Sequence, residues 1–155
     1  MTAIHPSAQP TSDNTGKCAS CVLGRFCVTA GLSEAELQQL DEVVNERHRL
    51  KKGQQLFAMS APLEAIYAVR FGMLKSHVTL ADGREQITAF HLPGEIVGLD
   101  AIGTQQHLSD ATALEDSEVC VMRYAELEAL AQSIPALQRQ ISRLLSQTIA
   151  HDQQL

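Results

Sequence analysis

Near the start of the chain, apolar residues recur at the spacing of a helix. Four of them share one face by the i, i+3, i+4 pattern: Leu37, Leu40, Val43 and Val44. Ser33 and Glu36 stand at the positions of a capping box, in which the serine side chain caps the helix and the glutamate reaches back. The pattern predicts a helix from about residue 33 to residue 46.

From residue 51 to residue 122, short apolar runs alternate with glycine, proline and Asp-Gly turn signals. The runs that predict strands cover residues 56–57, 66–69, 74–80, 87–92, 96–97 and 119–122. Short runs separated by such turns are typical of a small antiparallel barrel or sandwich. Asp82 and Gly83 lie between two of these runs and predict a hairpin.

The end of the chain returns to helical spacing. Residues 125–132 predict one helix, and a second one restarts with Ser133 as its cap and Pro135 near its first position. The second helix carries an apolar stripe at i, i+3, i+4, i+7 spacing: Leu137, Ile141, Leu144, Leu145, Thr148, Ile149 and Leu155. Because neither a glycine cap nor a proline follows, we expect this helix to be cut short at Leu155.

Composition and charge narrow the class of protein. Hydrophobic residues make up 45% of the 155 residues and charged residues 19%, which suits a globular protein with a packed core. The net charge of -6 argues against unaided DNA binding, because DNA-binding modules neutralise phosphates with a basic face. Residues 1–17 are polar and predict a flexible tail, and neither a signal peptide nor a membrane span is evident. We therefore expect a cytoplasmic protein.

Four cysteines carry the candidate chemistry. Cys18, Cys21 and Cys27 form a Cys-x2-Cys-x5-Cys segment, and Cys120 lies far away in a strand-like run. Disulfides seldom persist in a reducing cytosol, so these residues indicate ligands or redox groups. Four thiolates suit an iron–sulfur cluster, but zinc, a reversible thiol switch and plain buried thiols are alternatives that spacing leaves open.

The remaining residues predict no enzyme, because the sequence shows no catalytic base, Gly-rich dinucleotide loop or second cluster motif. The six histidines lack metal-ligand spacing. We interpret His77 and His91, which fall in strand-like runs, as structural residues.

Several segments together resemble the FNR branch of the CRP–FNR family of transcription regulators. Beside the cysteine segment, they are Leu50–Phe57, Ile66–Arg70, Glu85–Gly94, Val97–Ile102 and Ala113–Cys120. The resemblance implies an α+β fold: an antiparallel β-roll of the cyclic-nucleotide-binding jelly-roll type, flanked by an N-terminal cluster loop and helix and a long C-terminal dimerisation helix. Residues 18–30 correspond to the cluster loop, 31–134 to the sensory domain and 135–155 to the dimerisation helix, and the family's helix-turn-helix is absent.

The same resemblance implies an oxygen-sensing mechanism. A [4Fe-4S] cluster on Cys18, Cys21, Cys27 and Cys120 favours a homodimer without oxygen, and oxygen degrades the cluster and dissociates the dimer. The intact protein would bind palindromic DNA through one helix-turn-helix per subunit and contact RNA polymerase with the loop at residues 81–85. This chain alone is not expected to bind DNA.

The expected seam between the two subunits lies on the last helix and consists of Ile141, Leu144, Leu145, Thr148 and Asp152. Residues at a two-fold axis meet their own copies, so two Asp152 carboxylates would weaken association of the cluster-free form. An aspartate at a solvated helix end is the alternative, and helical spacing leaves both interpretations open.

A cyclic-nucleotide effector module is the competing function, beside a zinc or thiol switch. In cyclic-nucleotide-binding relatives, an arginine and a small hydroxyl residue hold the cyclic phosphate. The matching stretch here, Leu108–Thr112, has no arginine and puts Asp110 where the anion would lie, so a carboxylate would repel the phosphate. We therefore expect no binding of cyclic AMP.

Overall fold

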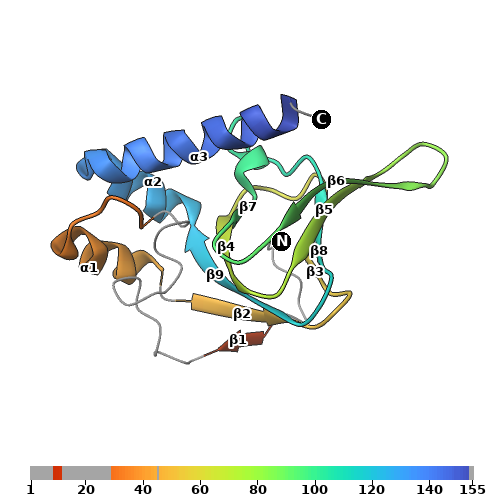
Figure 1. Ribbon diagram of the computed structural model, residues 1–155, viewed down its shortest axis with the longest axis horizontal. Coiled ribbons are helices and arrows are strands. Elements are labelled where there is room, and N and C mark those ends of the chain that lie inside the picture. The colour runs from red at the N-terminus through yellow and green to blue at the C-terminus, as the bar shows by residue number, and fades with distance from the viewer. Residues whose placement is uncertain (1–8, 12–28, 45, 154–155) are drawn as a thin grey trace.

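Two antiparallel sheets form the body of the molecule, and helices pack against one side of it (Figure 1). The computed structural model describes residues 9–11, 29–44 and 46–153. In spatial order, the larger sheet contains β1 (Gln9–Thr11), β2 (Glu46–Leu50), β9 (Ser117–Arg123), β4 (Ala65–Phe71) and β7 (Ile96–Val97). The smaller sheet contains β3 (Gln55–Phe57), β8 (Asp110–Ala113), β5 (Leu74–Thr79) and β6 (Glu85–His91). This β-roll confirms the predicted fold class.

The helices that the structure describes are α1 (Glu34–Val43), α2 (Tyr124–Ser133), α3 (Pro135–Gln153) and the short 3-10 helix η2 (Leu99–Ala101). Among these residues, no helix combines the length and the apolar run that a bilayer crossing requires.

The capping box of α1 is confirmed. The Glu36 backbone N–H donates to Ser33 Oγ at 3.2 Å, and the Ser33 N–H donates to Glu36 Oε1 at 2.9 Å. The predicted end of this helix at residue 46 is wrong, because α1 ends at Val43 and Glu46 already begins β2. The polar run Glu-Arg-His-Arg in β2 has no strand-like alternation, and the pairing of β2 with β9 determines its conformation.

Short sequence signals predicted the hairpin and the start of the last helix, but not the cap of that helix. β5 and β6 pair around Asp82 and Gly83, as predicted. Pro135 is the first residue of α3, which is also as predicted. The capping role of Ser133 is wrong: its hydroxyl donates to the Leu130 carbonyl at 2.9 Å within α2, and the Ile134 carbonyl accepts the Leu137 N–H at 3.0 Å.

The larger sheet buries both of its faces, and alternation along its strands separates two cores. Side chains facing the inside of the roll include Tyr67 and Val69 of β4 and Val119 and Val121 of β9. The opposite face, which we call the helix-facing core, combines Ile66, Ala68 and Met122 with Leu40, Leu127, Ala131, Leu137 and Ile141 of the helices. One strand therefore contacts both the interior of the roll and all three long helices.

A buried carboxylate joins three strands of the larger sheet. The Glu118 side chain is 1% exposed and accepts hydrogen bonds from Arg70 Nη1 at 2.7 Å and Arg49 Nε at 3.3 Å. Burial raises the pKa of Glu118, but the hydrogen bonds from Arg70 and Arg49 outweigh burial and hold that pKa below its ordinary value. The ion pairs therefore stabilise the fold above pH 5, and this contribution is lost as the pH falls through the depressed pKa.

We expect Glu118→Gln to lower the free energy of unfolding at pH 7 by about 1–3 kcal/mol, because two arginines lose a buried counter-charge. The loss should be smaller at pH 3 than at pH 7, because acid disfavours the ionised form of Glu118 in the parent protein. Urea unfolding at both pH values measures the effect. Asp82→Asn is the matched control, because its pair with Arg84 is exposed and should change stability by less than about 0.5 kcal/mol. Equal stabilities of Glu118→Gln and the parent at pH 7 would contradict the assignment.

Candidate functional site

Of the four predicted ligands, only Cys120 lies in the part of the chain that the structure describes. Cys18, Cys21 and Cys27 fall within residues 12–28, outside the described ranges. Their ligand role, and the cluster loop at residues 18–30, therefore stay predictions. The site is built below from Cys120 and the residues that border the cysteine segment.

Cys120 lies in the middle of β9 and packs, half-buried, against the helix-facing core. It is directly opposite Arg47 of β2 on one side and Ala68 of β4 on the other. Directly opposite residues of antiparallel strands share a face, with Cβ atoms about 4.5–5.5 Å apart. The Arg47 residue is 7% exposed, so a buried guanidinium shares this face of the sheet with the thiol.

The strand that precedes the cysteine segment, β1, lies in the same sheet as Cys120 and is separated from its strand by β2. Thr11, the last residue of β1, is opposite Arg47, so Thr11, Arg47, Cys120 and Ala68 form one row across four strands. Strands are about 4.8 Å apart, which puts the backbone of Thr11 roughly 10 Å from that of Cys120. Cys18 is seven positions after Thr11 in the chain, and an extended chain of that length spans about 23 Å. The segment can therefore bring its cysteines to Cys120.

The other end of the cysteine segment meets the same core. Thr29, two residues after Cys27, is 7% exposed, and Leu32 packs against the helix-facing core to which Cys120 also belongs. Within residues 9–11, 29–44 and 46–153, no three His, Cys, Asp or Glu side chains gather into a metal site. Any cluster on Cys120 thus requires the cysteines of the segment between Thr11 and Thr29.

Arginines lie on this face beside Cys120, and Glu118 is the counter-charge of two of them, Arg49 and Arg70. Cys120 lies between Glu118 and Met122 along β9, and the arginines of the face are Arg47, Arg49 and Arg70. The charge of Arg47 contributes to the lowered pKa of Glu118, after the hydrogen bonds from Arg70 and Arg49. Four thiolates around a cubane core leave a net negative charge, which nearby guanidinium groups stabilise. The donor type and the charge of this face therefore fit an iron–sulfur cluster.

A cavity of about 610 Å³ separates the roll from α3. Its polar lining includes Ser76, His91 and Asp100 from the roll and Gln140 and Arg143 from the helix. Ser76 Oγ and His91 Nε2 are 2.7 Å apart, and burial lowers the pKa of His91 to about 4, so this imidazole is neutral at pH 7. Among the described residues that line the roll side of the cavity, none is a lysine or an arginine.

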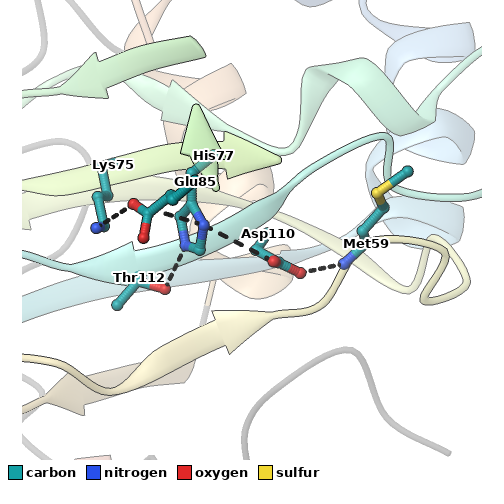
Figure 2. Close-up of polar contacts among 6 residues, drawn as sticks. All are labelled: Met59, Lys75, His77, Glu85, Asp110 and Thr112. Atoms are coloured by element: carbon teal, nitrogen blue, oxygen red, sulfur yellow. Dashed lines mark hydrogen bonds and ion pairs between the residues drawn. The ribbon is translucent and has the colours of Figure 1, made fainter. Parts of the chain in front are cut away.

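The predicted position of Asp110 is wrong. Asp110 is not in the cavity lining; it lies on the outer face of the smaller sheet, where its carboxylate accepts the Met59 N–H at 2.6 Å (Figure 2). The carboxylates that face the cavity are Glu95 and Asp100. Burial raises the pKa of Asp100, but hydrogen bonds from His107 and the Leu108 N–H outweigh it and keep the pKa low. A phosphate would thus meet acidic groups, although not the one expected.

The predicted seam on α3 divides into two parts. Ile141 is 8% exposed and belongs to the helix-facing core of its own chain, so little of it is left for a second subunit. Leu144 and Leu145 are half-buried, whereas Thr148 is exposed and its hydroxyl donates to the Leu144 carbonyl at 2.9 Å. Asp152 lies in α3, eleven residues after Ile141 and on the same stripe by helical spacing. The part of the stripe from Leu145 onward is the open one.

Comparison with known proteins agrees with this architecture. The family model of the cyclic nucleotide-binding domain matches residues 47–133. The chain is 47% identical over 146 residues to the transcriptional regulatory protein btr of Bordetella pertussis, covering 94% of this chain and 60% of that protein. It is 44% identical to the fumarate and nitrate reduction regulatory protein of Vibrio cholerae and 43% identical to the anaerobic regulatory protein of Haemophilus influenzae. Each of these matches covers 89% of this chain and, respectively, 55% and 54% of the relative.

Solved structures share the fold. FixK2 from Bradyrhizobium japonicum superposes with a TM-score of 0.65 at 29% identity, over 70% of this chain and 54% of that one. The catabolite activator protein of Thermus thermophilus gives a TM-score of 0.68 at 22% identity, over 80% of this chain and 58% of that one. The chain therefore spans between about half and three fifths of the lengths of these relatives.

Proposed function

Because the chain belongs to the FNR branch of the CRP–FNR family of transcription regulators, we propose that it is the oxygen-sensing half of an anaerobic regulator. In this proposal a [4Fe-4S] cluster on Cys18, Cys21, Cys27 and Cys120 controls formation of a homodimer. Binding of palindromic DNA and contact with RNA polymerase by the intact protein belong to the same proposal, as does its cytoplasmic location. The proposal includes no role for cyclic AMP; the carboxylates of Glu95 and Asp100 on the roll side of the cavity support this, and the arginine of the described lining, Arg143, comes from α3.

The register of β1, β2 and β9 is the observation that carries this proposal. It aligns Thr11, which precedes the cysteine segment, with Cys120 across the sheet. A thiol switch between Cys18 and Cys21 would not need Cys120, whereas a site built on four thiolates would. The fixed alignment of a distant thiol with the start of the segment instead favours a site that uses both.

The chain's own residues supply the frame of the site. When bound, the cluster would be held by Cys18, Cys21, Cys27 and Cys120 and would supply an oxygen-reactive group. Cys120 attaches the cysteine segment to β9, and Arg47 offsets negative charge beside that thiolate. The hydrophobic neighbours of Cys120 in the helix-facing core limit the access of water to it.

The same core connects the site to the dimerisation helix. Cys120 packs against a cluster of side chains that also contains Leu137 and Ile141 of α3. A change in the surroundings of Cys120 can therefore alter the packing of α3 without any long-range strain. Only a few kcal/mol are needed to shift a poised dimerisation equilibrium.

We expect Cys120→Ala and Cys21→Ala each to abolish stable cluster binding, because four thiolates are required. Anaerobic reconstitution should give about four iron and four sulfide per parent chain and a visible band that fades in air. Ser20→Ala, next to a ligand in the same segment, should keep the full cluster. A parent protein that holds one zinc and no iron, or a full cluster in Cys120→Ala, would overturn the ligand set.

We expect Arg47→Gln to shift the reduction potential of the reconstituted cluster to more negative values. A nearby cation stabilises the reduced, more negatively charged cluster, so its loss disfavours reduction. Arg47→Lys should restore most of the parent potential, and Arg84→Gln at the exposed hairpin tip should leave it unchanged. Identical potentials in the parent and Arg47→Gln would show that Arg47 acts only in folding.

We expect Asp152→Ala to strengthen dimerisation of the cluster-free chain in air, because it removes two carboxylates from the open part of the seam. Removing like-charge repulsion should lower the dimer dissociation constant by about tenfold, measured by sedimentation equilibrium. Glu126→Ala on α2 is the control for a general reduction of negative charge. An unchanged monomer would exclude Asp152 from the switch and favour the solvated helix end.

A further inference from the structure

Charged and polar side chains from three strands of the smaller sheet gather beside the β5–β6 hairpin (Figure 2). His77 of β5 occupies the centre, and its side chain is only 11% exposed. Lys75 lies on the same strand, Glu85 on β6, and Asp110 and Thr112 on β8. The group thus contains side chains from three neighbouring strands.

The two ring nitrogens of His77 have different surroundings. Nε2 is 2.8 Å from Thr112 Oγ1, within hydrogen-bond distance. Nδ1 is 3.7 Å from Glu85 Oε1 and 3.8 Å from Asp110 Oδ2, and it is buried without a hydrogen bond to any described group. Nδ1 therefore faces two carboxylates from opposite sides, and neither is close enough to satisfy it in the present geometry.

The charge balance of this group depends on the protonation of His77. Lys75 forms an ion pair with Glu85, and Asp110 accepts the Met59 N–H. With neutral His77, the group carries one positive and two negative charges; with protonated His77, the charges balance. Protonation also makes both ring nitrogens donors, so Nε2–H can donate to Thr112 while Nδ1–H donates toward the carboxylates.

The hairpin is joined to the rest of the smaller sheet through its first strand, β5. β6 is the edge strand of the smaller sheet and pairs with β5 alone among the described strands. The pairing register shifts between Ser76 and His77, so the ladder is irregular at this position. The loop beyond it extends away from the roll (Figure 1).

We propose that His77 is a pH-sensitive clamp, whose protonated ring fastens the edge strand β6, through Glu85, to the inner strand β8, through Asp110. The loop at residues 81–85, which we assign above to contact with RNA polymerase, is then presented more rigidly at low cytosolic pH. The clamp does not depend on the cluster. Evidence against the clamp would therefore leave the proposed oxygen sensor unaffected, and the reverse is also true.

The direction of the pH effect depends on the protonation state in which the clamp forms. The clamp is present when His77 is charged and both carboxylates are ionised. The hydrogen bond from Lys75, opposed by burial and aided by the charge of His77, lowers the pKa of Glu85, so this group stays ionised in mild acid. The hairpin should therefore be firmer near pH 5.5 than near pH 7.5, because acid favours the charged form of an imidazole.

Hydrogen–deuterium exchange of the whole chain at pH 5.5 and pH 7.5 tests the clamp. After correction for the intrinsic pH dependence of amide exchange, protection of residues 74–91 should be about two- to fivefold greater at pH 5.5. Protection of β2 and β9 serves as the internal reference. The absence of any pH-dependent protection in the hairpin would overturn the proposal.

Two variants and one control separate the clamp from other histidines. His77→Gln should remove the pH dependence, since the amide keeps polar contacts but does not titrate in this range. Asp110→Asn should reduce it while an amide oxygen still accepts the Met59 N–H. His151→Gln, on an exposed turn of α3, should retain the full dependence. An unchanged dependence in His77→Gln, or its loss in His151→Gln, would exclude His77 as the clamp.

Discussion

Strand β9 is paired with β2 on one side and β4 on the other, and neither of its faces is open to solvent along its central residues. Val119 and Val121 fill the roll, while Cys120 and Met122 face the helices. Because successive side chains of a strand alternate, the register of β9 determines the composition of both cores at once. The buried Glu118 adds a polar contact that ties β9 to its two neighbours.

In the proposed function, this arrangement would let the sensing site and the output helix α3 share one core. The face that carries Cys120 is the face on which α1, α2 and the first half of α3 rest. Close-packed side chains cannot deform independently, so a rearrangement near Cys120 changes the support of α3. The roll interior, on the opposite face, keeps its own set of contacts and serves as the rigid support.

Features that depend on adjacent residues could be predicted from the sequence, whereas features that depend on distant residues could not. The capping box at Ser33, the hairpin at Gly83 and the helix start at Pro135 depend on a few adjacent residues and were predicted correctly. β2 and β8 were missed because their polar sequences become strands only through pairing with distant strands. The position of Asp110 and the partners of His77 depend on which face of a twisted sheet each residue occupies. The role of the N-terminal cysteines is a matter of chemistry and stays a prediction.

The division of α3 has a mechanical consequence. The helix is held at Leu137 and Ile141, and its later turns extend past the core with Ile149 58% exposed. At a rise of 1.5 Å per residue, the twelve residues from Ile141 to Gln153 form an arm about 18 Å long. A tilt of about 10° at the held end would move the free end by roughly 3 Å, comparable to a large fraction of one helical turn. In the proposed homodimer, a small packing adjustment at the held end would thus be amplified into a displacement large enough to bring two such arms into or out of register.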